Sequence, residues 1–203
     1  RALKTTQVAA IGADDLAGLT SDHMAALVSA QVAALSTDQI VALDTEQFAA
    51  IDPLAIKGFS SGQIPSFSTA QVAALTSDQV VAFSAAQLVS FETQDVRALT
   101  SENIVALGTN QIRALATEQI RNLTTEQVAA IETDDMDALR NDQIVALTTA
   151  HYRNMSTEQL VALTTAQIAA METADLAALD TEQVAALTTS QVAALTTNQF
   201  SKL

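Results

Sequence analysis

The stretch TTEQVAAI, residues 124–131, is one unit of the repeat that decides the fold. From Lys4 to Leu203 the chain divides into twenty-five consecutive units of eight residues, without insertion or deletion. Every unit has an apolar residue at its fifth and eighth positions. Because self-similarity at a fixed period is typical of solenoids and other arrays, the sequence predicts that each unit packs only against other units.

Each octad, with positions numbered one to eight, carries signals for beginning and ending a short helix. An unbroken α-helix would turn its apolar stripe by about 80° per octad, so the helix should break once per unit. Ser, Thr or Asp at position one with Gln at position four matches the capping box, as in Thr124 with Gln127 and Ser156 with Gln159. These four residues are the predicted structural caps. We therefore predict an all-α solenoid with one short helix per octad.

A β-solenoid is the main alternative, but the apolar spacing of three and then five residues does not fit the strand period of two. Helices this short are marginal in isolation, so stacking must stabilise them. We expect one repeat domain over residues 1–203, with octads from 4 to 203, as a segment of a longer protein.

A second period of forty residues overlies the octads. Position four, usually Gln, is Asp at Asp15, Asp95, Asp135 and Asp175, and Ala55 occupies the remaining slot of that series. Either a forty-residue block was duplicated, or five octads complete a whole number of superhelical turns. On the second explanation an acidic stripe should run along one side of the array, formed by Glu92, Asp95, Glu132, Asp135, Glu172 and Asp175.

The composition disfavours several classes of function. The net charge is −14 and only nine residues are Lys or Arg, whereas nucleic-acid binding needs clustered cations. There is no cysteine for a disulfide or thiolate site, and no apolar run approaches the roughly 20 residues of a membrane-spanning helix. We expect no nucleic-acid partner and no membrane insertion.

Residues that could carry chemistry are few. His23 and His151 replace Gln at position four, and we interpret both as cap substitutes. Glu132, Asp134, Asp135 and Asp137 crowd one unit and are calcium candidates, although acidic residues in a first helical turn also favour the helix dipole. We predict no catalytic residue and no cofactor, so the chain is not expected to be an enzyme.

The units DTEQVAAL and TTSQVAAL, within residues 179–195, resemble octapeptide arrays of the LTTxQVAAL type in very large bacterial surface or secreted proteins, often adhesin-like. The resemblance covers the whole chain and transfers no functional residue. It implies an extracellular or cell-surface rod, stalk or filament, with self-association into filaments or bundles. The alternative is a binding solenoid that presents a groove to a protein or glycan partner.

Overall fold

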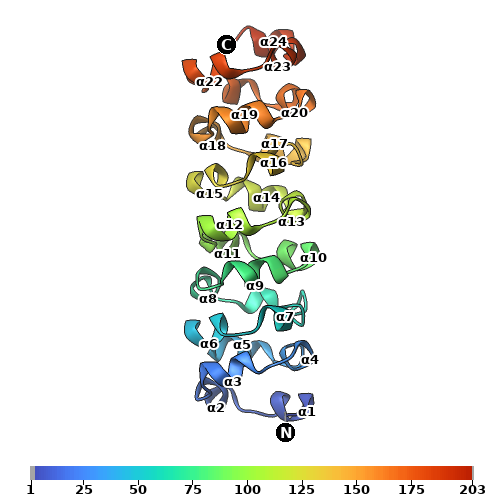
Figure 1. Ribbon diagram of the computed structural model, residues 1–203, viewed down its shortest axis with the longest axis vertical. Helices are drawn as coiled ribbons and strands as arrows, with labels where there is room; N and C mark the ends of the chain where they lie inside the picture. Colours follow the sequence, from blue (N-terminus) through green and yellow to red (C-terminus); the bar gives the residue numbers. More distant parts are fainter. Residues whose placement is uncertain (1–2, 203) are drawn as a thin grey trace. The chain divides into compact units, whose positions relative to one another are not determined.

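The computed structural model describes residues 3–202 and divides into two compact units, Arg1–Leu107 and Gly108–Leu203 (Figure 1). The boundary falls between two octads, so each unit contains whole repeats. Nothing in the periodicity marks this boundary. The prediction of a single array over residues 1–203 stays a prediction.

Every octad forms one short helix. In unit 1 these are α1 Thr5–Ala9, α2 Ala13–Ala17, α3 Ser21–Ala25, α4 Ser29–Val32, α5 Thr37–Ala42, α6 Thr45–Ala49, α7 Pro53–Ile56, η1 Ile64–Ser66, α8 Thr69–Ala73, α9 Ser77–Ala82, α10 Ala85–Val89, α11 Thr93–Ala98 and α12 Ser101–Ala106. In unit 2 they are α13 Thr109–Ala114, α14 Thr117–Arg121, α15 Thr125–Ala129, α16 Thr133–Met136, α17 Asn141–Ala146, α18 Thr149–Asn154, α19 Thr157–Ala162, α20 Thr165–Ala170, α21 Thr173–Leu176, α22 Thr181–Ala186, α23 Thr189–Ala194 and α24 Thr197–Phe200.

Residues 3–202 contain no strand, and the predicted all-α repeat solenoid is confirmed. The element η1 is a 3-10 helix rather than an α-helix. Its octad contains Pro65, which lacks the N–H that an α-helical bond would need.

The helices begin and end where the octad signals predict. The α15 cap, Thr124, has an extended backbone (φ −77°, ψ 162°), and the helix ends at Ala130 (φ −85°, ψ −10°). No described residue has a positive φ, so the chain reverses without left-handed glycines. Instead, extended residues around positions eight and one redirect it from each helix to the next.

Helices stack at intervals of three octads within each unit (Figure 1). In unit 1, α2 contacts α5 and α4 contacts α7, while in unit 2, α14 contacts α17 and α17 contacts α20. Hydrogen bonds between turns join residues 28 and 31 apart, as Gln71 does with the carbonyl oxygens of Leu43 and Ile40. One turn therefore takes between three and four octads.

The core of each unit consists of the side chains at positions five and eight, which are buried throughout its interior. Position six faces outward, and even apolar residues there are exposed, such as Val41 and Val145. Because the core is a column of layers, each turn buries its apolar side chains only against the adjacent turns.

Five of the six phenylalanines form one cluster in unit 1, namely Phe48, Phe59, Phe67, Phe83 and Phe91. The Phe67 ring is central, with ring centroids 4.9 Å from Phe48, 4.9 Å from Phe59 and 5.8 Å from Phe91. The stretch from Asp52 to Phe67 departs furthest from the plain octad. Part of that departure is explained by Phe59 and Phe67, which are large core residues in place of leucine.

The backbone of Gly58 in unit 1 lies against the backbone of Ser29 on the adjacent turn. A Cβ atom at Gly58 would overlap the Ser29 carbonyl group and lie 2.9 Å from the Ser29 Cα atom. Backbone atoms cannot move aside as a flexible side chain can. Close approach of two turns, rather than an unusual φ, therefore requires glycine at position 58.

We expect Gly58→Ala to lower the free energy of unfolding by about 1–3 kcal/mol, the usual effect of forcing an extra methyl group into a packed site. The matched control is Gly62→Ala, because the atom nearest to its added Cβ would be Ser60 Oγ at 4.0 Å. Urea denaturation monitored by circular dichroism measures the free energy of unfolding of both variants. Equal midpoints for the two variants would contradict the assigned contact.

Candidate functional site

The main polar feature of each turn is the glutamine at position four. In unit 1, Gln71 Oε1 accepts from the Ser68 backbone N–H at 2.8 Å, which completes the helix cap. Gln71 Nε2 donates to the carbonyl oxygens of Ile40 and Leu43, each at 2.8 Å. One side chain thus caps its own helix and binds the turn before it. We call this arrangement the glutamine ladder.

The ladder recurs in both units. The bond to the carbonyl 28 residues earlier is made by Gln31, Gln39, Gln47, Gln63, Gln71, Gln79, Gln87, Gln143, Gln159, Gln167, Gln183, Gln191 and Gln199. These amides are buried. Each bond satisfies a backbone carbonyl that would otherwise be left without a donor between two turns.

The four predicted caps lie where the sequence placed them. Thr124 Oγ1 accepts from Gln127 N at 3.1 Å, and Gln127 Oε1 accepts from Thr124 N at 2.8 Å. The same pair of bonds joins Ser156 and Gln159, at 3.2 Å and 3.1 Å. Gln159 Nε2 also donates to the carbonyl oxygens of Val128 and Ile131, a role that the capping box does not include.

His151 performs the same two functions with an imidazole. Its Nδ1 accepts from the Thr148 backbone N–H at 3.1 Å, and its Nε2 lies 2.9 Å from the Leu123 carbonyl oxygen, 28 residues earlier. Both contacts are satisfied by the neutral ring with its proton on Nε2. Burial lowers the pKa of His151, which favours that neutral form. His23, in the first turn, caps Thr20 in the same way and is exposed.

The donating half of the ladder is the feature that sequence reasoning missed. A signal for it was present, because glutamate never occupies position four although nine glutamates occur elsewhere in the chain. A capping box accepts Glu as readily as Gln, so capping alone does not explain that exclusion. Gln, Asn and neutral His can both accept and donate a hydrogen bond, whereas ionised Glu can only accept.

The predicted acidic surface stripe is wrong. Asp95, Asp135 and Asp175 are buried at position four, with exposed fractions of 0%, 5% and 4%. The preceding caps Glu92, Glu132 and Glu172 are exposed. Five octads are not a whole number of turns when each turn takes between three and four octads, so Glu132 and Glu172 do not lie above one another in unit 2. The geometric explanation of the forty-residue period therefore fails.

The calcium candidates do not converge. Asp135 is buried, while Glu132, Asp134 and Asp137 are exposed around it. Among residues 3–202, no group of three or more His, Asp or Glu side chains is arranged to hold a metal ion.

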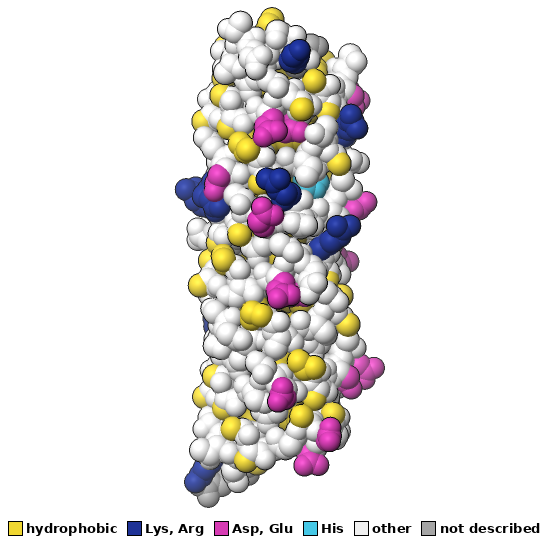
Figure 2. Space-filling model, turned by 180° about the vertical axis from the view of Figure 1, so that it is seen from behind, with side chains coloured by type: hydrophobic (Ala, Val, Ile, Leu, Met, Phe, Trp, Pro, Cys, Tyr) yellow, Lys and Arg dark blue, Asp and Glu magenta, His cyan; other side chains and the backbone are white. Residues whose placement is uncertain are grey.

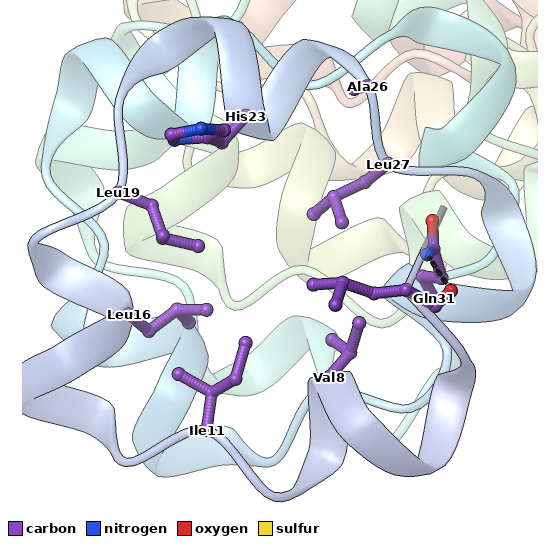
Figure 3. Close-up of a pocket in the computed structure, with 9 residues that line it drawn as sticks. Val8, Ile11, Leu16, Leu19, His23, Ala26, Leu27 and Gln31 are labelled. Carbon is purple, nitrogen blue, oxygen red and sulfur yellow. Dashed lines mark hydrogen bonds between the residues drawn. The ribbon is translucent and has the colours of Figure 1, made fainter. Parts of the chain in front are cut away.

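A pocket of about 330 Å³ opens at the first turn of unit 1 (Figure 3). Val8, Ile11, Leu16, Leu19 and Leu27 point into it. These apolar side chains belong to positions five and eight, which adjacent turns cover elsewhere in the unit.

A second cleft, of about 310 Å³, lies in unit 1 where Ala55 replaces a ladder glutamine. Its lining includes Leu27, whose carbonyl oxygen is the one that a glutamine at position 55 would reach by the ladder spacing. Val28 and Leu54 stand beside it with 58% and 73% of their side chains exposed. Loss of one amide thus coincides with an open, partly apolar notch.

Charged side chains are scattered over the face drawn in Figure 2. Acidic side chains are spread along this face, and no broad patch of one sign is formed. Exposed ion pairs such as Arg121 with Glu118, at 4.0 Å, contribute little to stability.

The repeat was also compared with known families. A model described as the ALTTAQ repeat matches residues 1–29, 24–53, 48–85, 88–125, 128–173 and 168–203, which is nearly the whole chain. The chain belongs to the ALTTAQ repeat family. The six letters themselves stand at residues 162–167, where they join the end of one octad to the cap and ladder glutamine of the next. The comparison with curated proteins finds no match.

As an ALTTAQ array, the chain is a repeat protein, and the predicted octapeptide-repeat character is confirmed. Its link to large bacterial adhesin-like proteins stays a prediction. None of the helices within residues 3–202 has the length and apolar character needed to cross a lipid bilayer.

Proposed function

We propose that this ALTTAQ array is a structural protein that forms a rod, stalk or filament outside the bacterial cell, without catalytic activity. The observation that carries the proposal is the glutamine ladder, which joins each turn to the one before it through buried hydrogen bonds. Every added turn repeats the same bonds and the same layer of core. Length therefore increases without any change in the interactions that stabilise each turn.

Electron microscopy of the isolated full chain is the direct test of the rod. Uniform thin particles or ordered polymers would support it, whereas compact round particles would contradict it. Protease treatment of intact cells tests the location separately, because a surface array is digested while the membrane remains closed. Survival of the array until the cells are lysed would contradict an extracellular role.

Self-association into filaments or bundles belongs to the same proposal. Sedimentation velocity of the full chain over a range of concentrations tests it: concentration-dependent polymers would support self-association, and a monomer at every concentration would contradict it.

The alternative function is a binding solenoid, and the cleft beside Ala55 favours it. Exposed Val28 and Leu54 offer apolar contact there, and backbone carbonyl groups offer hydrogen-bond acceptors. Ala55→Gln adds the missing side chain to this cleft. A glycan array or peptide library that binds the unmodified chain but not Ala55→Gln would support the alternative, and equal binding by both would exclude this cleft.

A further inference from the structure

The ladder position makes two demands on its side chain. It must accept from the backbone N–H three residues earlier, and it must donate to a carbonyl oxygen of the preceding turn. Glutamine meets both demands through its amide. An ionised aspartate meets only the first, since a carboxylate has no proton to donate.

Asp95 occupies this position in unit 1 and is completely buried, with an exposed fraction of 0%. Its Oδ2 accepts from the Glu92 backbone N–H at 3.3 Å. Its Oδ1 has no hydrogen-bond partner, and among the described residues it is the one buried side-chain atom in that state. The ladder spacing of 28 residues assigns the Phe67 carbonyl oxygen as its counterpart, which would place two acceptors opposite each other.

Asn103, in the same unit, shows that a side chain of this length can reach a carbonyl oxygen of the preceding turn. Its Oδ1 accepts from the Thr100 N–H at 3.0 Å, and its Nδ2 donates to the Leu75 carbonyl oxygen, 28 residues earlier, at 3.1 Å. Aspartic acid and asparagine have nearly the same shape. The difference at position 95 is therefore the missing proton rather than the missing length.

At Asp175, in unit 2, the side chains of neighbouring residues supply the hydrogen-bond donors that a carboxylate lacks. The Thr149 hydroxyl donates to Asp175 Oδ1 at 2.7 Å. The Tyr152 hydroxyl donates at 2.8 Å to the Ile144 carbonyl oxygen, which lies 31 residues before Asp175 and is the second ladder acceptor. Thr69 and Val72 stand at the same sequence distances before Asp95 as Thr149 and Tyr152 do before Asp175. Thr69 makes no bond to Asp95, and Val72 has no hydroxyl group.

We propose that Asp95 is a proton-binding site of the folded array, where its neutral carboxyl group replaces the ladder amide by donating from Oδ1 to the Phe67 carbonyl oxygen. Oδ2 continues to accept from Glu92 N–H. The carboxyl group then meets both demands of the ladder. Loss of the proton would leave a buried charge facing a backbone acceptor, so the contact between these two turns depends on pH.

The electrostatic surroundings agree with this assignment. The pKa of Asp95 is raised to about 6, chiefly by burial and also by the charge of Glu92, against the lowering effect of the Glu92 N–H bond. Within unit 1, the helix packed against α11 is α8, which carries no ionisable residue. On α11 itself the charged groups are Asp95, Arg97, which is exposed, and the cap Glu92.

The sign of the effect follows from the raised pKa. The folded state holds the Asp95 proton more tightly than the unfolded chain, so the stabilisation is complete below about pH 4 and is lost as the pH rises through about 6. Between pH 5 and pH 7.5 this one group should increase the unfolding equilibrium constant roughly tenfold.

Urea denaturation of the full chain at pH 5.0 and pH 7.5 tests the proposal. Asp95→Asn supplies a permanent donor of the same length, so it should be more stable than the unmodified chain at pH 7.5 and should lose the tenfold pH dependence. Asp78→Asn is the matched control, because Asp78 is exposed on the same unit. It should keep the full pH dependence. Parallel pH profiles for the unmodified chain and Asp95→Asn would overturn the proposal.

A second measurement does not depend on the variant folding well. The carboxyl carbon of Asp95, assigned by NMR in the unmodified folded chain, should titrate at about pH 6. Titration near the ordinary aspartate value of about 4 would overturn the proposal. So would stabilisation by calcium or sodium ions at pH 7.5 that Asp95→Asn abolishes, since the position would then hold a cation in place of the proton.

Discussion

Replacing Phe67 with alanine is expected to lower the free energy of unfolding by about 3–5 kcal/mol, the usual range for deleting a buried aromatic side chain. Phe67 is 4% exposed, and its ring contacts four other phenylalanine rings. Alanine would leave a cavity that no single neighbour can fill, because the surrounding rings come from four different octads. Urea denaturation monitored by helical circular dichroism measures the loss.

Two variants separate cavity formation from loss of ring contacts. Phe67→Leu keeps most of the volume and should recover more than half of the lost stability. Phe200→Ala removes a ring that is 61% exposed, and we expect a change below about 1 kcal/mol. If Phe67→Ala were no more harmful than Phe200→Ala, the cluster would not be the core of unit 1.

Replacing Gln71 with methionine should lower the free energy of unfolding by about 2–5 kcal/mol, although the side chain keeps its size and becomes more apolar. The substitution leaves the Ser68 N–H and the carbonyl oxygens of Ile40 and Leu43 without their partners in a buried site. Each buried polar group left unpaired costs about 1–3 kcal/mol. Hydrogen exchange should also show faster exchange at the Ser68 amide.

Gln94→Met is the matched control, since Gln94 is exposed at position three of another octad of unit 1. Its effect should lie within about 0.5 kcal/mol. Gln71→Asn should be milder than Gln71→Met, because Asn103 already makes both kinds of ladder bond. Equal losses in the methionine and asparagine variants would show that side-chain length, rather than hydrogen bonding, decides stability at this position.

Much of the fold could be predicted because its signals are local. Thr124 and Gln127 lie three residues apart, so their reciprocal cap depends on a few backbone angles that the sequence reports directly. The burial of positions five and eight follows from the same short helix. Pro65 was the exception, since its missing N–H converts one α-helix to a 3-10 helix.

The candidate sites were less predictable because each depends on residues from different turns. The donor role of Gln159 requires knowing that Ile131 lies 28 residues away on the adjacent turn. On its geometric explanation, the period of forty residues predicts that Asp95 and Asp175 lie on a surface stripe. Position four of the octad instead faces the interior, so both side chains are buried.

By itself, the sequence determined the repeat, the cap at the start of each helix, the helix in every octad and the apolar layer. These depend on interactions among about eight neighbouring residues. Only the tertiary structure decided how many octads complete a turn, which carbonyl groups the glutamines reach, and where the phenylalanine rings meet. The physical reason is that the change of chain direction at each reversal accumulates from octad to octad. The accumulated angle decides which residues, 28 apart in the sequence, become hydrogen-bond partners, and no single octad specifies it.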